Sequence, residues 1–90
     1  MDKKICKKAL DHYGFRNQTN KAKEELAECI VAISKLEFGV DGGQQMVIEE
    51  IADVEIMLQQ MKMFLHIELE VDVTIKSKLN RLKRRMNGTE

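Results

Sequence analysis

Residues 24–28 read Glu-Glu-Leu-Ala-Glu, and residues 49–53 read Glu-Glu-Ile-Ala-Asp. Both stretches follow one order: two glutamates, an aliphatic residue, an alanine and a further acid. The chain contains no proline, and both stretches lie within long segments whose apolar residues recur at helical spacing. Because residues three apart share a helix face, each stretch presents a pair of carboxylates on one face. This repeat is the centre of the predicted fold.

The acidic stretches belong to the middle two of four predicted helices. Asp2 is a suitable N-cap for the first helix, Asn17 or Thr19 for the second, and Asp72 for the fourth. The Asp-Gly-Gly sequence at residues 41–43 breaks the pattern between the second and third helices and is expected to reverse the chain. The predicted helices span about residues 2–13, 18–38, 44–65 and 72–86.

Length and composition predict a single all-α domain, a four-helix bundle spanning residues 1–90. A chain of 90 residues buries only about 60–65% of its unfolded surface, so we expect oligomerisation to complete the bundle. The formal net charge of zero makes nucleic acid or an anionic membrane an unlikely partner. No apolar run approaches the roughly 20 residues that a membrane span needs. Two cysteines without CxxC spacing predict reduced thiols in a cytoplasmic protein.

The helical wheel separates each acidic stretch into inner and outer carboxylates. With about 100° per residue, Glu28 lies about 60° to one side of Glu25, and the predicted apolar stripe lies about 20–100° to the other. Asp53 has the same relation to Glu50. The inner pairs therefore border the predicted core. In the second helix this stripe comprises Ala22, Leu26, Cys29, Ile33 and Leu36.

The outer glutamates, Glu24 and Glu49, are expected to be more exposed. Antiparallel packing of the two long helices would bring the four inner carboxylates together at the border of the core. Carboxylates at close quarters repel one another, and hard divalent cations with oxygen ligands relieve this repulsion. The pattern alone leaves open the alternative of a solvated acidic face.

The spacing also carries a family resemblance. Glu24-Glu25-x-x-Glu28, followed by 21 intervening residues and then Glu50-x-x-Asp53, resembles the EExxE…ExxD signature of the MazG-like, all-α nucleoside triphosphate pyrophosphohydrolases. The resemblance implies that the four inner acids are metal ligands for Mg²⁺, which Mn²⁺ can replace. It also implies hydrolysis of nucleoside triphosphates between the α and β phosphates. The products are the monophosphate and pyrophosphate, in nucleotide-pool housekeeping.

The resemblance extends over roughly residues 12–85. It includes Tyr13-Gly14-Phe15 before the first acidic stretch and the basic segment from Lys78 to Lys83. The pattern is similar to the short, single-domain MazG-like proteins common in phages and prophages. The family implies an assembly of two or four copies, a homodimer or homotetramer built on four-helix cores.

Individual roles follow from the motif positions and the wheel. Either Glu25 or Glu28 is expected to take the proton from the attacking water, and the sequence does not decide between them. Lys21 lies one turn before Glu25, and Gln18 lies on the same side, so both are candidate substrate-binding residues. Two basic residues of the last helix resemble the family's C-terminal phosphate contacts: Lys78 and Arg81.

Two other functions stay open at this point. A phosphoribosyl-ATP pyrophosphohydrolase shares this helical fold, although the C-terminal segment here lacks the pattern of that group. A non-catalytic helical interaction module would use the acids as a solvated face and the basic segment as a contact for an acidic partner. A di-iron bundle is set aside because no histidine follows Glu25 or Glu50 at the Glu-x-x-His spacing.

Overall fold

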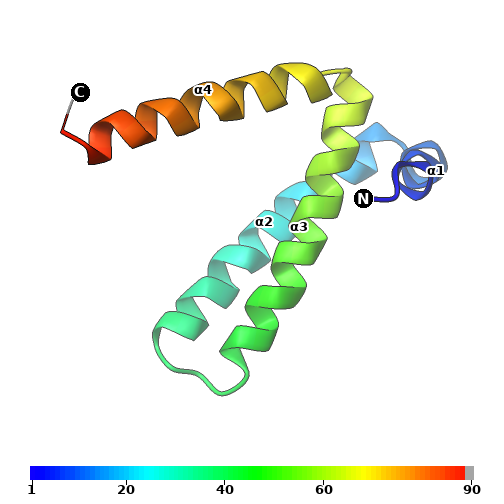
Figure 1. The fold of residues 1–90 in the computed structure, drawn as a ribbon. Helices are drawn as coiled ribbons and strands as arrows, with labels where there is room; N and C mark the ends of the chain where they lie inside the picture. The colour runs from blue at the N-terminus through cyan, green and yellow to red at the C-terminus, as the bar shows by residue number, and fades with distance from the viewer. Residues whose placement is uncertain (89–90) are drawn as a thin grey trace.

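The computed structural model describes residues 1–88, so Thr89 and Glu90 of the predicted domain lie outside the described residues. The described part is all-helical and contains no strand. Figure 1 shows two long helices side by side, a short helix near one end of this pair, and a last helix that extends away. The four helices are α1 (Lys3–Tyr13), α2 (Phe15–Glu37), α3 (Gly43–Leu65) and α4 (Glu68–Met86).

The junction between α1 and α2 is shorter than predicted. Asp2 caps α1 by accepting a backbone N–H at 3.1 Å. Gly14 alone separates the helices, with φ at 86°, a conformation that glycine adopts at little cost. Helix α2 therefore begins at Phe15 rather than near residue 18. Asn17 and Thr19 do not cap it, because their side chains donate to backbone carbonyls of the preceding turn.

The junction between α3 and α4 is also shorter than predicted. Only His66 and Ile67 separate the helices, and His66 adopts the left-handed conformation with φ at 57°. Helix α4 begins at Glu68, so Asp72 lies inside the first turns of the helix and is not its cap. The early start places Glu68 in the first turn, where the helix dipole favours a negative charge.

Helices α2 and α3 form an antiparallel hairpin reversed by the turn at residues 38–42. Small side chains at the contact allow the two backbones to approach closely. Ala22 and Ala32 of α2 are buried. Gly43, the first residue of α3, lies so near α2 that an added Cβ would come within 2.9 Å of the Leu36 Cα. The turn therefore fixes the register of the hairpin.

A polar network ties α1 and α4 to the open end of the hairpin. Lys3 of α1 forms an ion pair with Glu68 of α4 at 2.8 Å. The same carboxylate accepts a 3.2 Å hydrogen bond from the buried Gln59 of α3. Cys6 and Leu10 are the buried residues of α1. The short first helix thus closes one end of the structure.

The predicted apolar stripe is only partly the buried face of α2. Ala22 of the stripe is buried, but Leu26 is 43% exposed, and Ile33 and Leu36 are also exposed. The other buried residues of this helix are not members of the stripe: Gln18, Glu25 and Ala32. The contact with α3 is therefore centred on Glu25, and the larger aliphatic residues lie on the flank of the hairpin.

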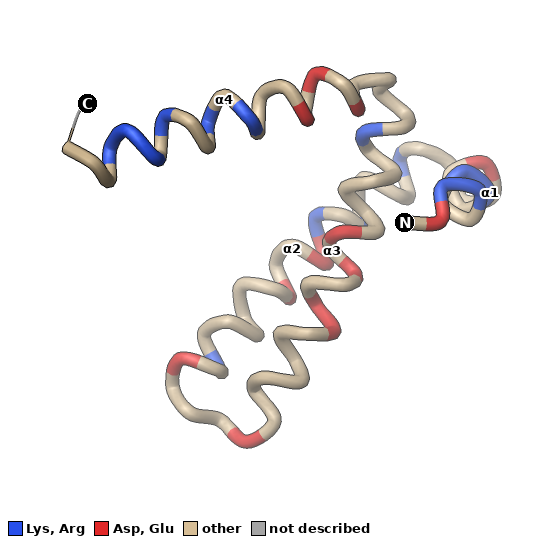
Figure 2. The backbone as a smooth tube through the Cα atoms, in the orientation of Figure 1, with Lys and Arg blue, Asp and Glu red and all other residues tan. Residues whose placement is uncertain are grey.

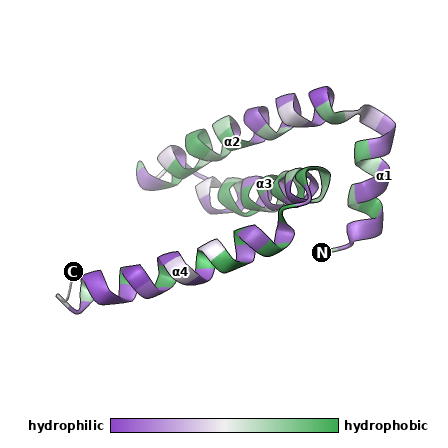
Figure 3. Ribbon diagram, turned by 90° about the horizontal axis from the view of Figure 1, so that it is seen from above, coloured by the Kyte–Doolittle hydropathy of each residue, from purple (hydrophilic) through white to green (hydrophobic). Residues whose placement is uncertain are grey.

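Helix α4 does not close a bundle with the other three helices. It diverges from the hairpin in both views (Figures 1 and 3), and none of its side chains is buried. The radius of gyration of 16.1 Å exceeds the roughly 12 Å expected of a compact domain of this length. Within residues 1–88, no helix has the length and apolar character required to cross a membrane.

We predict that Gly43→Ala destabilises the protein by about 1–3 kcal/mol, because the new methyl group meets backbone atoms of α2 that cannot move independently. Denaturant unfolding followed by circular dichroism measures the change. Gln45→Ala, two residues away and exposed, is the matched control and should be near neutral. Equal stability of the two variants would contradict the close approach of the helices.

Candidate metal site

Glu25 lies at the centre of the contact between α2 and α3. Its residue exposure is only 5%. Lys21, one turn earlier on α2, places its ammonium 3.1 Å from the Oε1 atom of Glu25. The other oxygen, Oε2, is buried and has no hydrogen-bond partner. A buried, unpartnered carboxylate oxygen is costly unless a ligand occupies its lone pairs.

Two acids of α3 meet Glu25 across the hairpin. Carboxylate oxygens of Glu25, Glu50 and Asp53 all lie within 4.8 Å of one another. The Oε2 atom of Glu50 is also buried and lacks a hydrogen-bond partner. The acids come together because Glu25 and Glu50 each point at the facing helix, and Asp53 follows Glu50 by one turn.

A second group of acids lies along α2. Oxygens of Glu24, Glu25 and Glu28 also lie within 4.8 Å of one another. Glu25 is therefore shared between the two groups, and Glu28 joins the site through it. The wheel placed Glu24 outside the inner acids, and the structure instead brings one of its oxygens near them. Glu49 belongs to neither group among residues 1–88.

The pKa values reflect crowding of negative charge. Burial raises the pKa of Glu50 and Asp53, and interaction with Glu25 raises both further. Burial and the charges of Glu25 and Glu24 likewise raise the pKa of Glu28. Burial also opposes ionisation of Glu25, yet its pKa is lowered. The Lys21 ammonium, 3.1 Å from one of its oxygens, favours its charged form. The site therefore carries an excess of negative charge that this one lysine does not balance.

The donor set fits a hard divalent cation. Carboxylate oxygens are the ligands that Mg²⁺ and related ions prefer, and Mg²⁺ usually retains waters and takes phosphate oxygens as well. The unpartnered buried oxygens of Glu25 and Glu50 point to such a ligand independently of the clustering. Glu25, Glu28, Glu50 and Asp53 are thus the residues that could hold the ion.

Two predicted substrate-binding residues of α2 are already engaged. The buried Gln18 donates a 2.6 Å hydrogen bond from Nε2 to Oε1 of Gln60, which joins α2 to α3 beside the site. Lys21 pairs with Glu25 and lies 3.6 Å from Glu24. These contacts raise the pKa of Lys21. Gln18 therefore has a packing role, whereas half of the Lys21 side chain remains exposed.

The basic residues of α4 are not brought to the acids of the same chain. Figure 2 shows positive charge along the last helix as it extends away from the acidic middle of α2 and α3. Lys78 and Arg81 line a shallow groove on α4 with Leu82 and Arg85. Their predicted contact with phosphate stays a prediction, and α4 of the same chain does not bring them to the acids because it diverges from the hairpin.

A pocket adjoining the acids includes a cation that the sequence reasoning missed. Lys35 lines this pocket together with Glu28 and Glu50. Its signal was present in the sequence: Lys35 follows Glu28 by seven residues, or two helical turns, so both lie on one face.

Comparisons with protein-family models, curated proteins and solved structures find no match to this chain.

We predict that Glu50→Gln raises the melting temperature of the metal-free protein at neutral pH. The pKa of Glu50 is raised in the folded state, so its protonated form favours folding and its ionised form disfavours folding. The wild-type protein therefore loses stability as pH rises through the range in which this carboxyl group ionises. Glutamine removes the charge and can donate a hydrogen bond to Glu25. Thermal unfolding between pH 4 and about 8 should therefore show an advantage that grows with pH.

Glu49→Gln, the outward neighbour, is the matched control and should change the melting temperature little. Mg²⁺ should stabilise wild type and the Glu49 variant, and should do little for the Glu50 variant. A Glu50 variant that is stabilised by Mg²⁺ as strongly as wild type would contradict the assignment of this ligand.

Proposed function

We propose that the protein is a Mg²⁺-dependent nucleoside triphosphate pyrophosphohydrolase. The observation that carries this proposal is the buried, unpartnered carboxylate oxygen of Glu25, which meets Glu50 and Asp53 from the facing helix. Such an arrangement suits a cation that also takes phosphate oxygens. The sequence resemblance to MazG-like enzymes supplies the reaction class, and the geometry is compatible with it.

Glu25, Glu28, Glu50 and Asp53 would hold the ion. When bound there, Mg²⁺ supplies charge neutralisation for phosphate oxygens and a lowered pKa for a coordinated water. Glu25 and Glu50 hold fixed positions because they lie between two packed helices. Such a preorganised set needs little rearrangement to bind a ligand.

Glu28 is the better proton acceptor of the two glutamates left open by the sequence. Glu25 is buried and its charge is already stabilised by Lys21. Glu28 lines the open pocket, where a water can reach its carboxylate. Water breaks the bond between the α and β phosphates, one proton passes to Glu28, and the nucleoside monophosphate and pyrophosphate are released.

Lys21 has two roles in this proposal. Its ammonium orients Glu25 and compensates part of the negative charge. Its exposed half also lies at the border of the site, where it can contact a phosphate. Lys78 and Arg81 contribute to phosphate binding only in an oligomer where α4 of one subunit approaches the acids of another.

An oligomer, a homodimer or homotetramer, is part of the proposal because one flank of the hairpin is apolar and uncovered. Leu26 follows Glu25, and Ile51 follows Glu50, so each lies about 100° around its helix from that glutamate. In an antiparallel hairpin, equal rotations from the facing position bring both side chains to the same side of the pair. Ile33 and Leu58, seven residues later on each helix, lie on that side too. All four are exposed. Glu28 and Asp53 rotate the other way, so association through this flank leaves the acids accessible.

We predict that the purified protein converts nucleoside triphosphates to monophosphates and pyrophosphate with Mg²⁺, and that Glu50→Gln lowers kcat/KM by at least about 100-fold. Loss of even an outer-shell partner costs about 10- to 100-fold. A panel of ribo- and deoxyribonucleoside triphosphates, assayed for pyrophosphate, measures the reaction. Glu49→Gln should retain activity near that of wild type.

Release of inorganic phosphate alone, or no product from any nucleotide, would overturn the proposed function. An interaction module would show neither Mg²⁺ binding nor linkage between Mg²⁺ and nucleotide. A phosphoribosyl-ATP pyrophosphohydrolase would leave the common nucleotides intact and cleave only its own substrate.

We also predict that the protein associates in solution and that Ile30→Asp weakens the association. Ile30 lies on the apolar flank, next to Leu26 in the helix, and is 67% exposed. A carboxylate there disfavours burial against a second copy. Sedimentation velocity over a range of concentrations measures the mass. Asn20→Asp, exposed on the same helix but rotated away from this flank, is the control, and a monomeric wild type would contradict the prediction.

A further inference from the structure

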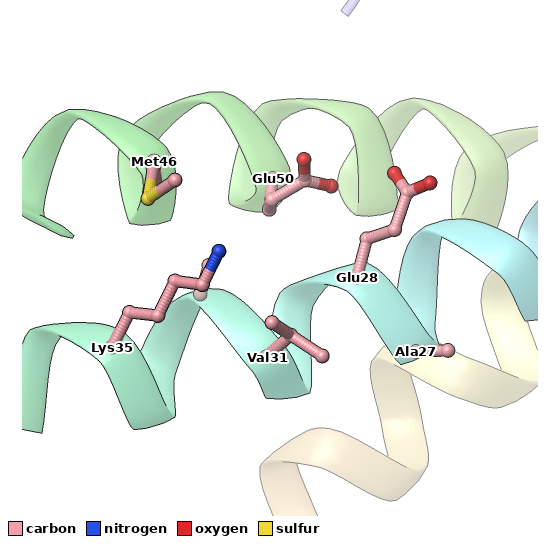
Figure 4. Close-up of a pocket in the computed structure, with 7 residues that line it drawn as sticks. Ala27, Glu28, Val31, Lys35, Met46 and Glu50 are labelled. Carbon is pink, nitrogen blue, oxygen red and sulfur yellow. The ribbon is translucent and has the colours of Figure 1, made fainter. Parts of the chain in front are cut away.

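The pocket that adjoins the acids lies between the second half of α2 and the first half of α3. Its volume is about 310 Å³, which is within the range of ligand pockets. Figure 4 shows the Glu28 and Glu50 carboxylates at one end and the Lys35 side chain at the other. Its lining consists of Ala27, Glu28, Val31, Ala32, Lys35, Met46 and Glu50.

Lys35 differs from the other lysine of the site. Lys21 is held by Glu25 at 3.1 Å and by Glu24 at 3.6 Å. Lys35 forms no ion pair with any residue of the described chain. In Figure 4 its ammonium points away from α2 and toward α3, into the space beside Met46. Its charge is therefore available to a ligand in the pocket.

We propose that Lys35 binds the pyrophosphate portion of the substrate, and that this pocket receives the phosphates released by the reaction. The inference rests on the proposed function, because it assumes a polyphosphate held at the four acids. A phosphate chain held by a cation at Glu28 and Glu50 would enter the pocket that these residues line. A charge-assisted bond from an ammonium to a phosphate is roughly twice as strong as a bond between neutral groups.

The rest of the lining is mostly apolar. Val31, Ala32 and Met46 border the pocket beside the exposed Lys35 side chain. A neutral nucleobase would suit the same walls, but it would leave the ammonium without an anionic partner. The cation therefore favours phosphate as the occupant.

The opposite end of the hairpin is the better place for the nucleoside. There Phe15 of α2 stacks on Phe64 of α3, with ring centroids 3.8 Å apart and planes at 9°. Both rings are partly exposed. Exposed aromatic faces suit a nucleobase, because stacking needs a flat apolar partner. The substrate would thus lie along the hairpin with its phosphates toward the turn at residues 38–42.

Calorimetric titration with two probes tests the assignment. Magnesium pyrophosphate reports the phosphate end, and adenosine monophosphate with Mg²⁺ reports the nucleoside end. We expect Lys35→Gln to weaken pyrophosphate binding by about 10- to 100-fold, the effect of losing a charged hydrogen bond, and to leave the monophosphate within about 2-fold. Lys35→Arg should retain most of the pyrophosphate affinity. Lys23→Gln, on an exposed face of α2, is the matched control.

The outcomes separate this inference from the function on which it rests. Unchanged pyrophosphate binding by Lys35→Gln overturns the inference alone, provided that wild type binds the probe. Selective loss of monophosphate binding also overturns it and assigns the pocket to the nucleoside. If wild type binds neither probe with Mg²⁺ and hydrolyses no nucleotide, the proposed function fails and this inference fails with it.

Discussion

The structure depends on one carboxylate placed between two helices. Glu25 occupies the centre of the contact between α2 and α3, a position where a globular protein usually places an aliphatic side chain. An ionised group there requires a partner, and Lys21 satisfies only one of its two oxygens. The other oxygen is buried without a partner, and the proposed binding position rests on it. The same residue therefore lies at the centre of both the packing of the hairpin and the candidate site.

This arrangement costs stability when no cation is bound. Glu50 and Asp53 meet Glu25 across the hairpin, and burial together with repulsion from Glu25 raises the pKa of both carboxyl groups. The buried apolar residues are few, and they form too small a core to compensate for this repulsion. A cation at the acids and a second copy on the apolar flank would supply the missing interactions. The rotation of the helices places the acids and the apolar flank on opposite sides of the hairpin, so the cation and the second copy would not compete for one surface.

Several elements were predictable because they depend on local chemistry. The helical class follows from apolar spacing and the absence of proline, and Asp2 and the glycine-rich turn act within a few residues. The predicted helix ends were wrong where the conformation of one residue outweighed the helix-capping propensity of its neighbours. Gly14 alone separates α1 from α2, so the polar residues that follow it already lie within α2. His66 makes most of the break before α4 by adopting a left-handed conformation.

The sequence alone determined which acids share a helix face, because helical periodicity is a local property. It did not determine that Glu25 would be buried while Leu26 stayed exposed, since the rotation of each helix depends on what packs against it. Small residues such as Ala22 and Gly43 allow the close approach that rotates Glu25 inward. The direction of α4 likewise depends on tertiary structure. The predicted four-helix bundle required α4 to pack on the hairpin, but the turn at His66 sends it away from the acids.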